Sequence, residues 1–310
     1  MYLVTPLILI LATASPEAET TVAGKDGWLF FAPELRHLET VAKLEHKEAI
    51  AAIVDFKRQL DEAGVELLLV PVPAKAAVYP EHVTKGAPGA DGTHQAFYMA
   101  LAKQGVEVLD LAPVFARAKQ GSRGRLYCQK DTHWSGEGCV VAARALAQAI
   151  ERRAWYAAVA KRKLDSERKT VELTGDLVRG RPDAGKEEVL LRAVGARDGE
   201  RLVPVPPDRA SPVLLLGDSH NLVFHAGGDM FAVGAGLPDQ LALELGFAVD
   251  LLAVRGSGAT PARLNLARRV RADAAYLAGK KLVVWCFSVR ELTQSNGWQK
   301  VSLKPRTGGS

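Results

Sequence analysis

Two short segments carry side chains whose types and spacing suit nucleophilic chemistry. The first reads DTHW at 131–134, and the second reads GDSH at 217–220. A serine hydroxyl becomes a nucleophile when an imidazole accepts its proton, and the imidazole needs a carboxylate to fix its tautomer. Asp131 and His133 are two residues apart, so in an extended segment both side chains project to one side. With Ser219 they form a candidate nucleophile, base and orienting carboxylate.

Each segment also has an ordinary structural interpretation. Gly-Asp-Ser is common in turns, and a serine in that position often caps a helix. Asp131 could cap the helix that follows, with His133 as a packing residue. The presence of all three chemical types in one chain favours the catalytic interpretation.

The elements that must position these segments are those of an α/β protein. Continuous apolar runs predict strands buried on both faces of a sheet, at 65–73, 106–111, 212–220, 249–254 and 281–287. Helical periodicity or an Ala-rich composition predicts helices at 41–63, 93–104, 135–152, 237–246 and 262–278. The sequence therefore predicts an α/β three-layer sandwich with a mainly parallel central sheet. Ligands of such sheets bind at the carboxyl ends of the strands, where the GDSH segment lies.

The composition is that of a globular protein. Of 310 residues, 48% are hydrophobic and 24% are charged, which excludes disordered, collagen-like and disulfide-scaffold classes for the whole chain. The net charge of +5 is spread along the chain and indicates no nucleic-acid partner. The three cysteines form no C-x-x-C motif, so we expect buried free thiols or at most one bridge.

The N-terminus carries an apolar run, YLVTPLILILATA, at residues 2–14. Its length suits the core of a signal peptide, and it ends in an Ala-x-Ala pattern typical of a cleavage site. We expect residues 1–14 to be a signal peptide or an N-terminal anchor, and 15–310 to form one domain. A buried N-terminal strand is the alternative. Residues 157–210 are charged, rich in Gly and Pro and weakly periodic, which predicts an insertion, a lid or a surface hairpin.

The chain resembles the alginate O-acetyltransferases of the AlgJ/AlgX type, in the SGNH (GDSL-like) hydrolase superfamily. In ordinary members of the superfamily the serine block precedes the Asp-x-x-His block, whereas in the AlgJ/AlgX type Asp-x-His-Trp comes first, as here. Further similar segments are GKDGWLFF (24–31), PVPAKAAVYPE (71–81), TGDL (174–177) and WCFSVREL (285–292).

This resemblance implies an SGNH-like fold and a triad of Ser219, His133 and Asp131 that carries an acetyl group on the serine. We expect no cofactor and no metal. In the superfamily a glycine amide and an asparagine side chain complete the oxyanion hole. Gly256 is the expected glycine, with Arg255 facing the site, and no asparagine is assigned.

The resemblance also implies partners and a location. The acceptor would be a hydroxyl of an exported polysaccharide, alginate-like or another exopolysaccharide, and a membrane-bound O-acyltransferase would supply the acetyl groups. The protein would be periplasmic or otherwise exported, and could be anchored to the inner membrane by its N-terminal segment. The alternatives are a carbohydrate acetylesterase, in which water replaces the sugar, and a non-catalytic polysaccharide-binding component of an export complex.

Several other residues have a functional and a structural interpretation. Asp218, His220 and His225 could ligate a metal, but their spacing offers no further ligand. Trp28, Trp134 and Trp285 could stack on sugars, although aromatic residues beside strands are more often core residues. Lys75 and Tyr79 could lie on a cleft rim, with a surface loop as the favoured alternative. These residues are Asp218, His220, His225, Trp28, Trp134, Trp285, Lys75 and Tyr79.

Overall fold

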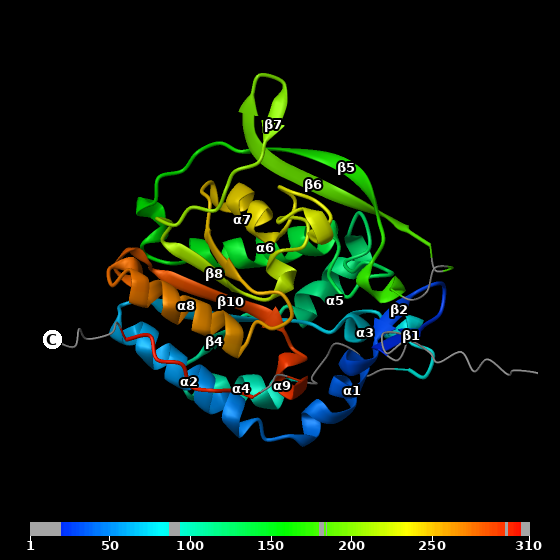
Figure 1. The fold of residues 1–310 in the computed structure, drawn as a ribbon, viewed down its shortest axis with the longest axis horizontal. Helices are drawn as coiled ribbons and strands as arrows, with labels where there is room; N and C mark the ends of the chain where they lie inside the picture. Colours follow the sequence, from blue (N-terminus) through cyan, green and yellow to red (C-terminus); the bar gives the residue numbers. More distant parts are fainter. Residues whose placement is uncertain (1–19, 87–93, 180–182, 184, 295–296, 305–310) are drawn as a thin grey trace, which may run out of the picture.

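The computed structural model describes residues 20–86, 94–179, 183, 185–294 and 297–304. Its centre is a parallel sheet with strand order β4-β3-β10-β8-β9 (Figure 1). The strands are β3 (Glu66–Val72), β4 (Glu107–Val108), β8 (Val213–Gly217), β9 (Asp250–Ala253) and β10 (Leu282–Ser288). The predicted α/β sandwich with a mainly parallel sheet is confirmed. Residues 1–14, the expected signal peptide or anchor, lie outside the described residues.

Both faces of this sheet are covered by helices, which explains the continuous apolar runs. On β10, Leu282 and Val284 pack into one core, whereas Val283 and Trp285 pack into the other. The first core includes α5 (Ala112–Gly121), α6 (Gly136–Glu151) and α7 (Leu237–Leu245). The second includes α2 (Lys47–Glu62), α4 (Gln95–Lys103) and α8 (Thr260–Ala272). Alternate side chains of one strand thus enter opposite layers.

Some boundaries differ from those expected from the sequence. Helix α2 begins at Lys47 because His46 adopts a left-handed backbone, with φ of 50°. The strand expected over 106–111 pairs only at Glu107–Val108, after which Asp110 accepts the N–H of Ala112 at 2.9 Å and the chain turns into α5. The helix expected to reach 278 ends at Ala272.

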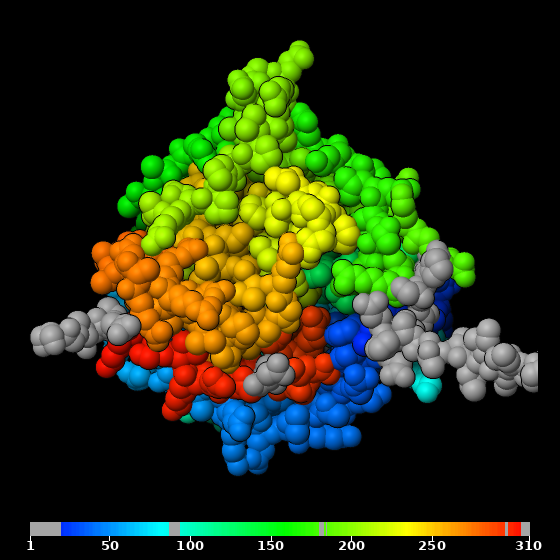
Figure 2. All heavy atoms as spheres, in the orientation of Figure 1, coloured from blue at the N-terminus to red at the C-terminus, as the bar shows by residue number. Residues whose placement is uncertain are grey.

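Residues 157–210 contain a second, antiparallel sheet. It consists of β5 (Asp165–Leu173), β6 (Glu187–Asp198) and β7 (Arg201–Val203). Leu191 of β6 is buried in the core that contains α6 and α7, while the β6–β7 end projects from the body of the molecule (Figures 1 and 2). The segment therefore has one apolar face against the helices and one solvated face, which accounts for its weak apolar signal.

The remaining elements are short. They are β1 (Thr21–Ala23), β2 (Leu29–Phe31), α1 (Ala32–Thr40), α3 (Lys75–Val78) and α9 (Glu291–Gln294), with 3₁₀ turns at Val41–Lys43, Pro80–His82, Tyr156–Ala158, Asp176–Val178, Ser219–Asn221, Gly228–Met230 and Tyr276–Gly279. Among the described residues, none of the helices has the length and apolar character needed to cross a membrane.

The aromatic and sulfur side chains discussed above lie in the core. Trp28, Trp134 and Trp285 are buried, as their structural interpretation predicted. The three cysteines, Cys128, Cys139 and Cys286, are buried free thiols, which confirms that expectation.

Candidate active site

Ser219, His133 and Asp131 form one hydrogen-bonded chain. The Ser219 hydroxyl donates to Nε2 of His133 at 2.8 Å, and Nδ1 of His133 donates to Oδ1 of Asp131 at 2.7 Å. A carboxylate only accepts, so Asp131 holds the ring proton on Nδ1 and leaves Nε2 able to take the serine proton. Ser219 and His133 are 7% and 6% exposed, which leaves little solvent to compete for these bonds.

The turn that carries Ser219 begins where β8 ends, at Gly217. A Cβ atom at Gly217 would lie 1.7 Å from the carbonyl oxygen of Cys286, so only glycine lets β8 and β10 pair here. Oδ2 of Asp218 accepts the N–H of Ser288, the last residue of β10, at 2.7 Å. The serine is therefore held at the carboxyl ends of two neighbouring strands, as its motif predicted.

His133, the candidate base, lies in a tight loop of residues 127–134 immediately before α6. Tyr127 and Trp134 form a β-bridge across the loop. The Ser135 hydroxyl oxygen then accepts the N–H groups of Glu137 and Gly138, each at 3.2 Å, which caps α6. His133 thus lies between a bridge and a helix cap, and both restrict its backbone.

Asp131 is held in its ionised form by its hydrogen-bond donors. Besides the imidazole, it accepts the backbone N–H of His133 at 2.9 Å and that of Asp176 at 2.7 Å. Burial would by itself raise the pKa of Asp131, but His133 and these donors outweigh it and lower the pKa to about 2. Burial would likewise lower the pKa of His133, but the charge of Asp131 raises it above the ordinary value.

Asp176 is a part of the site that the sequence analysis did not single out. Its carboxylate accepts from the N–H and the hydroxyl of Thr132, at 2.8 and 2.5 Å. Burial and the nearby charge of Asp131 raise the pKa of Asp176. Its Oδ2 lies 4.0 Å from Nδ1 of His133, too far for a hydrogen bond. The sequence signal for this residue is the TGDL segment at 174–177, which supports the resemblance but does not by itself assign a role to Asp176.

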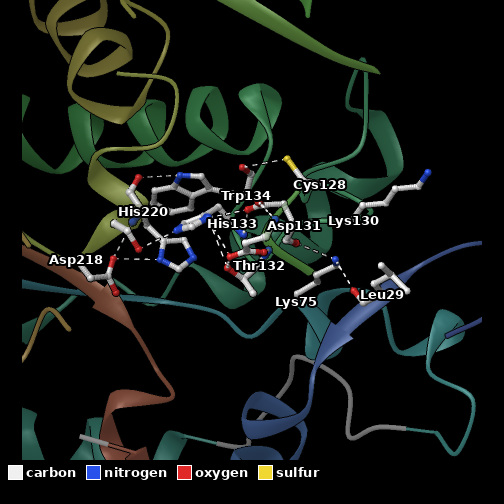
Figure 3. A network of polar contacts seen from close by, with 12 residues as sticks. Leu29, Lys75, Cys128, Lys130, Asp131, Thr132, His133, Trp134, Asp218 and His220 are labelled. Carbon is white, nitrogen blue, oxygen red and sulfur yellow. Dashed lines mark hydrogen bonds and ion pairs between the residues drawn. The ribbon is translucent and has the colours of Figure 1, made fainter. Parts of the chain in front are cut away.

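Lys75 does not lie in a surface loop, and the favoured interpretation of that residue was wrong. It is 1% exposed, and its ammonium group donates to the carbonyl oxygens of Leu29, Gln129 and Asp131 at 2.6, 3.0 and 3.0 Å (Figure 3). Tyr79 is buried as well. Burial lowers the pKa of Lys75 to about 8. Lys75 therefore links β2 to residues 129–134, called the base segment below because it contains His133. Its bond to the Asp131 carbonyl also fixes the backbone of that residue.

A second imidazole–carboxylate pair lies beside the first. His220 donates to Asp218 through Nδ1 at 3.1 Å, and its ring centroid is 4.9 Å from that of His133 (Figure 3). Burial lowers the pKa of His220, whereas His220 and backbone donors lower that of Asp218 to about 2 despite its burial. The lowered pKa favours the neutral form of His220, which places no positive charge beside the imidazole of His133.

The groups of metal-ligand type in this region are engaged in hydrogen bonds. His225 donates to Asp239 at 2.9 Å, so it is not joined to Asp218 and His220 as a metal site would require. Ligand atoms of Asp131, His133 and Asp176 lie within 4.8 Å of one another. The hydrogen bonds described above already use the ring nitrogens and carboxylates of these three residues, so their arrangement fits proton transfer.

Arg255 and Gly256 are the residues expected at the oxyanion hole, and both are exposed. Arg255 is exposed and pairs with Asp229 at 2.6 Å, and Gly256 lies in an exposed loop with φ of +90°. Among the described residues, no hydrogen bond joins either one to Ser219. Their roles stay predictions. Asn221 is buried, and its amide N–H group donates to the carbonyl oxygens of residues 218 and 286.

The fold and the site together define a class of protein. A parallel α/β sheet with a serine, a histidine and an aspartate in one hydrogen-bonded chain at its carboxyl edge is the architecture of SGNH-type esterases and acyltransferases. Residues 21–289 match the family model described as "SGNH hydrolase-like domain, acetyltransferase AlgX", and the chain belongs to this family. It is an O-acetyltransferase.

Similar proteins lie within the same family. The chain is 28% identical over 279 residues to the probable alginate O-acetylase AlgJ of Pseudomonas syringae pv. tomato, covering 89% of this chain and 70% of that protein. The O-acetyltransferase domain of Pseudomonas putida AlgJ superposes with a TM-score of 0.69 and 27% identity, over 89% of this chain and 93% of that one. Pseudomonas aeruginosa AlgX has the same fold, with a TM-score of 0.64, 17% identity and coverage of 86% and 62%.

Proposed function

We propose that this protein moves an acetyl group through Ser219 onto hydroxyl groups of an exported, acidic polysaccharide. The observation that carries the proposal is the buried chain from the Ser219 hydroxyl through His133 to Asp131, with contacts of 2.8 and 2.7 Å. This arrangement suits covalent catalysis by serine, because the base is already within reach of the proton that it must remove.

In the first step, Ser219 Oγ attacks the carbonyl carbon of an acetyl ester. The hydroxyl proton passes to Nε2 of His133, and the carbonyl π pair moves onto its oxygen. When the tetrahedral intermediate collapses, the bond to the leaving alcohol breaks and the leaving oxygen takes the proton from His133. Asp131 stays ionised throughout and stabilises the imidazolium. The product is acetylated Ser219.

In the second step, a sugar hydroxyl replaces the alcohol. His133 removes its proton, the sugar oxygen bonds to the acetyl carbon, and Ser219 leaves with the proton returned from His133. Water in place of the sugar would make the same protein an acetylesterase.

The acceptor is proposed from the charge, the relatives and a cavity. A net charge of +5 suits an acidic polymer, and several similar proteins are named alginate O-acetylases. A cavity of about 250 Å³ lies beside the base segment, and hydroxyl, carboxylate, guanidinium and aromatic groups line it. Its residues are Thr20, Thr21, Phe31, Thr132, Asp176, Leu177 and Arg179. Such a mixture suits a sugar ring, which has both polar edges and apolar faces.

The donor side and the location follow from the same proposal. The apolar run at 2–14 supports export, and the periplasm or the outer face of the inner membrane is the proposed location. A polymer acetylated there needs a source of acetyl groups across the membrane, and a membrane-bound O-acyltransferase is the proposed partner. Residues 15–310 are proposed to form the catalytic domain, with 157–210 as an insertion in it.

The test combines an acetyl ester donor with oligouronates of defined length. Wild-type protein should give acetylated oligosaccharides by mass spectrometry, and Ser219→Ala should give none while retaining its circular dichroism spectrum and oligosaccharide binding. Release of acetate with no acetylated sugar would instead indicate the acetylesterase. No acetylated product from either protein, with oligosaccharide binding retained, would leave only a binding role.

A further inference from the structure

Arg290 is a half-buried arginine whose guanidinium group has one buried nitrogen without a hydrogen-bond partner among the described residues. It follows β10, and its Nη1 atom is buried without a hydrogen bond. Within the part of the chain that the structure describes, its side chain also forms no ion pair. An arginine stays charged and has five N–H donors. Burying any of these N–H groups without an acceptor costs free energy. Such a group is expected where a ligand supplies the missing acceptor.

The position of Arg290 places this charge at the nucleophile end of the sheet. Two residues earlier, Ser288 donates its N–H to Asp218, which precedes the nucleophile. The Arg290 guanidinium lies 5.2 Å from the ring centroid of Phe31, a residue that also lines the cavity beside the base segment. Its charge contributes to lowering the pKa of His220, after burial and the neighbouring His133, which indicates that it acts within the same site.

The charge of Arg290 contributes to lowering the pKa values of three carboxyl groups, Glu34, Asp218 and Glu291, and each of these accepts hydrogen bonds from other groups. Glu34 accepts a backbone N–H at the start of α3 at 3.1 Å, and Glu291 accepts the Ser257 hydroxyl at 2.7 Å. Burial raises the pKa of Glu34, and it raises that of Glu291 to about 7, which weakens both as counter-ions. Asp218 already accepts from His220 and from the end of β10.

We propose that Arg290 binds a negatively charged oxygen of the reacting complex. The buried, unsatisfied Nη1 atom of Arg290, in a guanidinium group that lies over the ring of Phe31, carries this inference, which rests on Ser219 being the nucleophile. Two groups have the required chemistry. One is the oxygen of the tetrahedral intermediate, which gains the carbonyl π pair when Ser219 Oγ bonds to the acetyl carbon and its proton passes to His133. The other is the carboxylate of an acidic sugar acceptor.

Stability separates a ligand-binding role from a structural one. Arg290→Met removes a half-buried charge without breaking a hydrogen bond or an ion pair within the described residues, so the melting temperature should stay equal or rise while activity falls. Arg153→Met is the matched control. Arg153 pairs with Glu66 and Glu107 at 2.5 and 2.7 Å, at the opposite edge of the sheet, so its loss should lower the melting temperature and leave the rates unchanged.

The two half-reactions separate the two sources of the negative oxygen. The first measurement is the rate at which a neutral acetyl ester acetylates Ser219, and the second is discharge of the acetyl-enzyme by uronate or neutral oligosaccharides. If Arg290 binds the oxyanion, Arg290→Met slows the first step about 100-fold and also slows discharge by either oligosaccharide, because each half-reaction passes through a tetrahedral intermediate. If it binds the acceptor carboxylate, the first step is unchanged, and discharge by the uronate slows about tenfold or more to the rate of the neutral sugar.

A charge-retaining variant and chemical rescue complete the test. Arg290→Lys should keep part of whichever rate is lost, and added guanidinium ion at sub-denaturing concentration should raise that rate in Arg290→Ala but not in wild type. Unchanged rates in both half-reactions, or a loss of melting temperature with no rescue, would overturn the inference while leaving acetylated Ser219 intact. If wild type is never acetylated at Ser219, the proposed function fails first, and the inference fails with it.

Discussion

The indole N–H of Trp134 donates to the carbonyl oxygen of His220 at 3.0 Å. The residue after the base is thereby bonded to the residue after the nucleophile, although 86 positions separate them in the chain. This bond joins the two motifs through buried groups and fixes the distance between the imidazole of His133 and the hydroxyl of Ser219.

Trp134→Phe tests this link, because it keeps an aromatic ring and removes the donor. We expect kcat to fall about tenfold or more, since a small misplacement of the base slows proton transfer. The free energy of unfolding should fall by only about 1 to 2 kcal/mol, the cost of one buried hydrogen bond. Trp155→Phe is the control: its indole donates to Glu66 at 3.0 Å at the far edge of the sheet, so kcat should not change. Equal kcat losses in both variants would refute the link.

Asp131 and Asp176 should differ strongly in their effect on the rate. Asp131→Asn replaces the acceptor of the Nδ1 proton and favours the wrong tautomer of His133, so kcat should fall about 10³-fold or more. Asp176→Asn changes a group 4.0 Å from that nitrogen and should cost much less. Steady-state kinetics at matched substrate concentrations decide the point. The reverse order of effects would assign the orienting role to Asp176.

The pH dependence of the rate should report on His133. Its pKa is raised because the charge of Asp131 outweighs the effect of burial. Only the neutral ring accepts a proton, so kcat/KM should rise with pH through a midpoint above the ordinary histidine value of about 6.5. In Asp131→Asn the residual activity should show a lower midpoint, because the charge that raises the pKa is gone. A midpoint that moves upward in this variant would contradict the assigned electrostatics.

Acid should destabilise the fold over a defined interval. Asp131 and Asp218 each have a native pKa lowered to about 2, against about 3.9 in an unfolded chain. Their contribution is complete above pH of about 4 and is lost as the pH falls towards about 2, about 2 kcal/mol for each group. Urea unfolding at a series of pH values measures this loss. The slope should be smaller in Asp218→Asn, and an unchanged slope would exclude Asp218 as a source.

The parts of the fold that could be predicted are those whose signal is local. β3, β8 and β10 are buried on both faces, and such strands are continuous apolar runs in the sequence. β5 has one solvated face and many charged residues, so its pairing with β6 left no comparable pattern. β4 is short because its pairing is limited by the turn into α5, which the apolar run does not reveal.

The site shows the same difference between features with a local sequence signal and features that depend on distant segments. Ser219, His133 and Asp131 were predicted from their chemical types and local spacing, and in the structure hydrogen bonds join their side chains. The burial of Lys75 and of the Nη1 atom of Arg290 could not be predicted, because a cation is normally exposed and its sequence neighbours do not show that the fold will cover it. Their surroundings come from distant segments, which meet only after the sheet has formed.

The most direct test of the central claim is the mass of the intact protein after brief mixing with a neutral acetyl ester. The account predicts an increase of one acetyl group, mapped by peptide fragmentation to Ser219 and absent from Ser219→Ala. Addition of an acidic oligosaccharide should then remove the adduct faster than buffer alone and yield acetylated sugar. An acetyl group on another residue, or turnover by Ser219→Ala equal to that of wild type, would contradict the account.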